Sequence, residues 1–79
     1  MVSKGDLQDW VVDALRSNKG SASILYVAQH IWENHEKDLG GSPLFYSWQY
    51  DMRWACTRLR EKHVVKAAEL SHRGEWKLN

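Results

Sequence analysis

The sequence predicts one small, mainly α-helical domain with a short β-hairpin at its C-terminal end. The chain has 79 residues, which suffices for a single domain spanning 1–79, and its 43% hydrophobic and 27% charged residues are an ordinary globular balance. Apolar residues recur at helical spacing in three successive segments, and the pattern then changes to one typical of extended backbone. Each segment has its own start and stop signals.

The first predicted helix covers residues 6–17. Asp6 is the expected N-cap, and Gly20 follows the segment close to the left-handed position that commonly ends a helix. The apolar stripe of this helix consists of Leu7, Trp10, Val11, Ala14 and Leu15.

The second predicted helix begins after Ser23, its expected N-cap, and runs from residue 24 to residue 35 or beyond. Ser21 and Ala22, just before the cap, are expected to form a short extended piece. The inward stripe is predicted to be Ile24, Val27, Ala28 and Ile31, with Leu25 and Trp32 on its flank.

The third predicted helix, residues 47–62, follows a strong break at residues 40–43. The apolar run at residues 44–46 is expected to fold back on the core, and Ser47 is the expected N-cap. The narrow inward stripe is predicted to be Trp48, Met52, Ala55 and Leu59, with Cys56 beside it.

The tail predicts a strand at residues 64–70, a turn at 71–74 in which Gly74 takes a positive φ, and a second strand at 75–78. The extended piece near Ala22 can pair with this hairpin. Three helices followed by a two-stranded wing is the order of a winged helix. One core is expected to contain Leu15, Ala28, Ile31, Met52, Ala55, Leu59 and Trp76.

Charge is distributed unevenly along a chain whose net charge is only +1. Residues 1–52 carry four Lys or Arg against seven Asp or Glu, whereas residues 53–79 carry seven against three. This asymmetry suggests a basic face for an anionic partner, although a mixed, solvated surface explains it equally well. No signal peptide or apolar run of membrane-spanning length is apparent, and a single cysteine argues against a disulfide scaffold. We therefore expect a cytoplasmic, nuclear or nucleoid-associated protein without membrane contact.

Several motifs resemble the winged-helix domain at the N-terminus of Mrr-type restriction endonucleases. In the second half they are Trp54-Ala55, Leu59 and the run at residues 73–78, and in the first half Trp10, Ala14, Leu15, the run at 20–23, and Ile31-Trp32. The resemblance spans nearly the whole chain and implies double-stranded DNA binding, since a separate domain cuts DNA in that family. This chain has His63 where the family often has glycine after the third helix.

The outward face of the third helix is the predicted DNA-reading surface. Gln49 and Arg53 are residue types that bond adenine and guanine edges, and an arginine on a wing tip can contact phosphate or enter a minor groove. The predicted DNA-contacting residues are Ser47, Gln49, Tyr50, Arg53, Thr57, Arg60 and Arg73.

A protein-interaction domain or a homodimerising adaptor is the alternative. Tyr50, Trp54 or the Phe45-Tyr46 segment would then form an apolar patch for a partner or a second copy, and the weak net charge favours this interpretation. Clustered Arg and Lys around the third helix and wing would favour DNA, whereas an exposed aromatic patch would favour protein.

No catalytic or cofactor signature is apparent, so we expect a domain that is not an enzyme and needs no cofactor or metal. His30 and His35 do not share a helical face, His63 and His72 lie in different elements, and the spacing typical of zinc ligands is missing. Cys56 lies beside the inward stripe, where a packed core thiol is expected.

Overall fold

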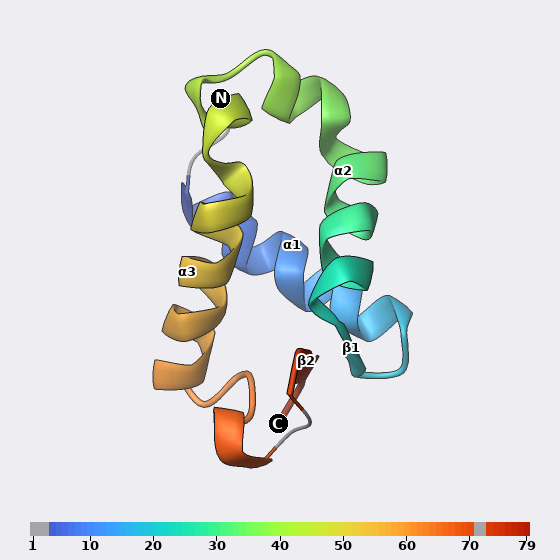
Figure 1. Ribbon diagram of the computed structural model, residues 1–79, viewed down its shortest axis with the longest axis vertical. Helices are drawn as coiled ribbons and strands as arrows, with labels where there is room; N and C mark the ends of the chain where they lie inside the picture. The colour runs from blue at the N-terminus through green and yellow to red at the C-terminus, as the bar shows by residue number, and fades with distance from the viewer. Residues whose placement is uncertain (1–3, 71–72) are drawn as a thin grey trace.

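Three helices and a two-stranded antiparallel sheet make up the domain in a computed structural model that describes residues 4–70 and 73–79. In Figure 1, α2 and α3 run side by side in opposite directions, α1 crosses behind both, and the sheet lies at the lower end. The elements in chain order are α1 (Lys4–Ser17), β1 (Ser21–Ser23), α2 (Ile24–Gly40), the 3-10 helix η1 (Pro43–Tyr46), α3 (Trp48–Glu61), the 3-10 helix η2 (Ala68–Leu70) and β2 (Glu75–Lys77).

The core lies where the three helices meet, and α1 is their common support. α1 packs extensively against α3 and also against α2, whereas α2 and α3 touch each other little. Six of the seven predicted core residues are buried, but Ala28 is only partly buried because it faces the space between α2 and α3. The buried apolar residues are Leu7, Val11, Ala14, Leu15, Ala22, Val27, Ile31, Leu39, Trp48, Met52, Ala55, Cys56, Leu59, Val65 and Trp76.

Predicted caps explain where two of the helices start and stop. The Ser23 hydroxyl accepts a 3.0 Å hydrogen bond from the Tyr26 amide at the start of α2, as predicted. Lys19 and Gly20 both have positive φ after α1, and the Gly20 amide donates to the Leu15 carbonyl. This backbone pattern ends a helix by satisfying its last carbonyls.

The start of α1 differs from the prediction, whereas α2 starts as predicted and extends beyond residue 35. Asp6 is not the N-cap, because α1 extends back to Lys4 and places Asp6 in its first turn, where a carboxylate suits the helix dipole. α2 continues through the polar residues 33–38 to Gly40, although His35 interrupts its helical geometry with a φ of −131°. The imidazole of His35 stacks on the Trp10 indole, with ring centroids 3.7 Å apart, and so fastens this kink to α1.

The predicted C-terminal hairpin is wrong in its first strand. Only Val65 of residues 64–70 makes a bridge, to Leu78, and Ala68–Leu70 form η2, in keeping with the low strand propensity of Ala and Glu. β2 pairs with β1, as predicted for the extended piece near Ala22, with Ala22 opposite Trp76, and β1 lies between α1 and α2. The fold is therefore mainly α with a two-stranded sheet that joins distant parts of the chain.

The predicted turn at 71–74 lies partly outside the described residues, since it includes Ser71 and His72. Gly74 has the predicted positive φ, at 78°. The segment before α3 also differs from expectation: Leu44 packs against the core, but Phe45 and Tyr46 are exposed and do not fold back on it.

Candidate binding surface of helices α2 and α3

The outward face of α3 is exposed because its opposite face is buried against the rest of the core. Trp48, Met52, Ala55 and Leu59 form the predicted inward stripe, and all four are buried. Helical geometry then directs the remaining positions outward. Gln49, Tyr50, Arg53 and Thr57, four of the residues predicted to contact DNA, are exposed on α3.

Ser47 differs from the predicted simple cap. Its hydroxyl donates a 2.8 Å hydrogen bond to the carboxylate of Asp51 and does not cap a backbone amide. Asp51 is the one buried charged side chain among the described residues, and the ammonium of Lys4 lies 3.6 Å from its other oxygen. Ser47 and Asp51 therefore anchor the start of α3 to α1, which fixes the position of the outward face that follows.

Two of the predicted contact residues, Thr57 and Arg60, hydrogen-bond to backbone carbonyls. The Thr57 hydroxyl donates to the Arg53 carbonyl one turn earlier, and Arg60 Nε donates to the Lys66 carbonyl at 3.1 Å. Arg60 is thereby held at the C-terminal end of α3, next to the segment that leads to η2.

Arg60 and Arg73 line one shallow cleft of about 370 Å³, together with Ile24 and Glu75. Ile24 also lines a second depression, which reaches up α3 to Arg53. Three predicted residues, Arg53, Arg60 and Arg73, therefore follow one another along the side of α3 that faces the start of α2.

Other cations near α3 are engaged with neighbouring side chains. Arg58 lies 4.5 Å from the centre of the Trp54 ring and 3.3 Å from a carboxylate oxygen of Glu61. Lys62 donates a hydrogen bond to Gln8 on α1. Trp54 is thus partly covered by Arg58 and is not a freely exposed ring.

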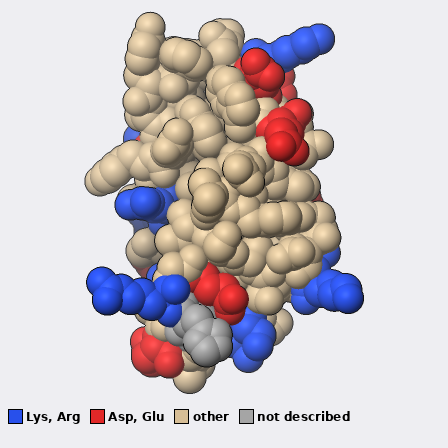
Figure 2. All heavy atoms as spheres, turned by 45° about the vertical axis from the view of Figure 1, so that its right-hand side comes forward, with Lys and Arg blue, Asp and Glu red and all other residues tan. Residues whose placement is uncertain are grey.

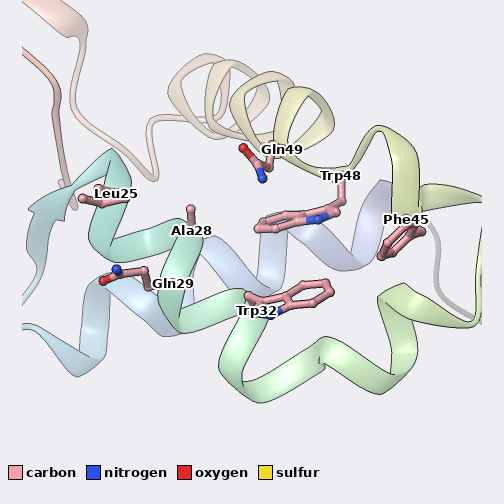
Figure 3. A pocket seen from close by; sticks show the side chains of 7 residues that line it. All are labelled: Leu25, Ala28, Gln29, Trp32, Phe45, Trp48 and Gln49. Atoms are coloured by element: carbon pink, nitrogen blue, oxygen red, sulfur yellow. The ribbon is translucent and has the colours of Figure 1, made fainter.

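An apolar groove between α2 and α3 was not predicted from the sequence. Its upper part has a volume of about 460 Å³ and is lined by Leu25, Ala28, Gln29, Trp32, Phe45, Trp48 and Gln49. Figure 3 shows Ala28 pointing from α2 toward α3, with Gln49 reaching down opposite it and the Trp48 and Trp32 rings beside them. These two rings stack with centroids 5.9 Å apart. One sequence signal could have revealed the groove: apolar residues occupy too much of the circumference of α2 for a single buried face.

Large apolar side chains stand exposed around this groove. Leu25 is 68% exposed, Tyr50 74% and Tyr46 91%. Figure 2 shows a broad central and upper-left surface without acidic or basic side chains, whereas basic side chains toward the lower end of the molecule are interspersed with acidic ones. Exposed aromatic side chains and Arg53 therefore lie next to each other along α3.

Cys56 and the histidines form no reactive or metal-binding cluster within residues 4–70 and 73–79. Burial raises the pKa of the Cys56 thiol to about 11, although the charge of Arg60 acts in the opposite direction. The thiol is thus protonated at neutral pH and poorly suited to nucleophilic attack. Over the same residues, the longest helices are too short or too polar to cross a membrane.

Comparison with known proteins gives no further guide to function. Neither protein-family models, nor curated proteins, nor solved structures yield a match to this chain. The resemblance to Mrr-type N-terminal domains remains a prediction from the motifs quoted above.

Proposed function

We propose that this chain is a double-stranded DNA-binding domain in which the N-terminal half of α3 enters the major groove. The observation that carries the proposal is the line of Arg53, Arg60 and Arg73 along one side of α3, with Gln49 exposed one turn before Arg53. A helix that presents a planar guanidinium and an amide from adjacent turns offers the two side chains best suited to guanine and adenine edges.

The backbone pairing at the C-terminal end supports this proposal, because we interpret it as a reduced wing. Val65 makes an isolated bridge to Leu78 beside the two-stranded sheet of β1 and β2, and we interpret this bridge as the remnant of a first wing strand. Arg73 precedes β2 and lies beside Arg60, where it could contact the phosphate backbone next to the groove occupied by α3.

Titration of a fluorescent randomised duplex at two salt concentrations tests the proposal. Replacing Arg53 with Ala should cost about 1–3 kcal/mol of binding free energy and relax base preference at one position. Replacing Arg73 should weaken all sequences alike and lower the salt slope by roughly one. Arg16→Ala is the matched control, because Arg16 is an exposed arginine at the end of α1.

The expected result is binding at low salt that Arg16→Ala leaves unchanged. A folded protein that fails to bind duplex at low ionic strength would end the proposal for this chain. Equal losses from Arg16, Arg53 and Arg73 would show nonspecific attraction and contradict a major-groove contact by α3.

A protein-binding function is the second candidate, and the apolar groove favours it. Exposed Leu25 has no polar atom in its side chain to bond a phosphate backbone, and together with the Tyr50 ring it suits an apolar protein surface. This groove supports a more specific inference.

A further inference from the structure

The upper groove has the geometry of a socket for a side chain from another helix. Leu25, Ala28, Gln29 and Trp32 occupy positions i, i+3, i+4 and i+7 of α2. Four residues at this spacing form the hole that receives one large side chain when helices pack together. The smallest of the four, Ala28, lies between Leu25 and Trp32 and leaves the depth such a side chain would fill.

A second depression continues the groove toward the middle of α3. It has a volume of about 500 Å³ and shares Leu25, Ala28 and Gln49 with the first, while Tyr50, Met52 and Arg53 line its other side. Two adjoining sockets can receive two apolar side chains that stand one turn apart on a partner helix, the arrangement by which amphipathic helices bind in grooves.

The charge at the groove favours a partner with an acidic residue over a partner with a basic one. None of the residues lining the two depressions is acidic, and Arg53 is their one charged residue. Within the described part of the chain, Arg53 has no carboxylate within ion-pair distance. A carboxylate placed at this end of the groove would therefore gain a partner, whereas a partner's lysine would meet like charge.

We propose that the groove between α2 and α3 binds an amphipathic helix from another protein, with two large apolar side chains in the sockets and an acidic residue beside Arg53. Binding would bury exposed Leu25 and Tyr50. The groove and the proposed DNA-reading surface share Gln49 and Arg53, so the helix would also displace DNA. This competition alone rests on the proposed function, since peptide binding does not require that DNA binds.

The test uses the whole chain and a synthetic helical peptide of about 18 residues, long enough to hold helical structure. Leu residues occupy one face at i, i+4 and i+7, and Glu residues flank the end meant for Arg53. A second peptide carries Lys in place of Glu, and a third has the first peptide's composition in scrambled order. Fluorescence anisotropy of labelled peptide measures binding, and light scattering gives the mass of the free protein.

Three variants test the groove itself. Leu25→Ser removes an exposed rim residue, and Leu70→Ser is its control, because Leu25 and Leu70 are 68% and 66% exposed. Ala28→Leu fills the socket, and Arg53→Glu reverses the charge. We expect each groove variant to weaken the acidic peptide about tenfold or more, with Leu70→Ser unchanged. Arg53→Glu should bind the lysine peptide better than the parent does. Circular dichroism verifies that each variant is folded.

Failure of the acidic peptide to bind folded protein, or equal binding of the scrambled or lysine peptide, would overturn the proposal. A dimeric free protein that Leu25→Ser makes monomeric would also overturn it, because a second copy would then cover the groove. A duplex added to the peptide complex distinguishes the two functions: peptide binding without DNA binding removes only the proposed DNA function, and displacement of duplex by peptide supports both.

Discussion

The two faces of α3 differ in whether the rest of the domain covers them. The inward face places Trp48, Met52, Ala55 and Leu59 in a core that α1 closes. The outward face carries Gln49, Tyr50 and Arg53 toward α2, but α2 and α3 touch little and leave a groove. A small domain has limited apolar surface to bury, and here it is concentrated on one side of the helix. Stability and binding can therefore be tested separately on this one helix.

Truncating the inward face should have the largest effect. Leu59→Ala removes a buried side chain and should lower the free energy of unfolding by about 2–5 kcal/mol, enough to threaten folding of so small a domain. Urea denaturation followed by circular dichroism measures this. Tyr50→Ala, on the exposed face, should change stability little. Equal losses from the two would mean that the outward face is also structural.

Removing the buried carboxylate at the start of α3 should cost less. Asp51→Ala leaves the Ser47 hydroxyl without its acceptor and loosens the link to α1, so we expect a loss of about 1–3 kcal/mol. Asp9→Ala is the control, because Asp9 is exposed on α1. Thermal denaturation of both variants gives the comparison, and a Tm of Asp51→Ala equal to that of Asp9→Ala would contradict an anchoring role.

Relieving strain at the end of α3 should stabilise the domain slightly. His63 has a φ of 62°, and the Val64 amide bonds the Leu59 carbonyl, the geometry that glycine usually adopts after a helix. His63→Gly should therefore raise the free energy of unfolding by about 0.5–1 kcal/mol. Lys62→Gly should do the opposite, since Lys62 is right-handed helical. If His63→Gly destabilises as much as Lys62→Gly, the positive φ is not a source of strain.

The Cys56 thiol on the inward face should affect stability only at alkaline pH. Its pKa is about 11 in the folded protein, because burial disfavours the thiolate. An exposed thiol in the unfolded chain ionises near pH 8.5, so the stabilising contribution is complete below that pH and is lost as pH rises toward 11. Unfolding free energies measured from pH 8 to 10.5 should fall more steeply for the parent than for Cys56→Ala. Parallel curves would mean that the thiol is not buried in solution.

Periodicity alone predicted the inward stripe of α3, because burying one helical face requires side chains at that spacing. The Ser23 cap and the positive φ of Gly74 were also predictable, since both follow from local backbone chemistry. The pairing of β2 with the extended piece near Ala22 was also predicted, whereas the strand predicted at residues 64–70 neglected the low strand propensity of Ala and Glu, and Ala68–Leu70 form η2.

The candidate site was only partly predictable from the sequence. Exposure of Gln49, Tyr50 and Arg53 follows from the register of α3. The groove depends on how far apart α2 and α3 lie, which is set by their separate packing on α1. The helical spacing of Ala28 predicts a core position, but in the structure Ala28 faces the groove.

The sheet has a consequence for the order of folding. β1 and β2 close a loop that contains α2 and α3, since Ala22 pairs with Trp76. The entropy lost on closing a loop grows with its length, and long-range pairings slow folding, whereas each helix can form from its own neighbours. We expect the helices to form and pack first, and the two short strands to pair last. Its amides should accordingly open first in the native protein and exchange with deuterium before those in the centre of α3.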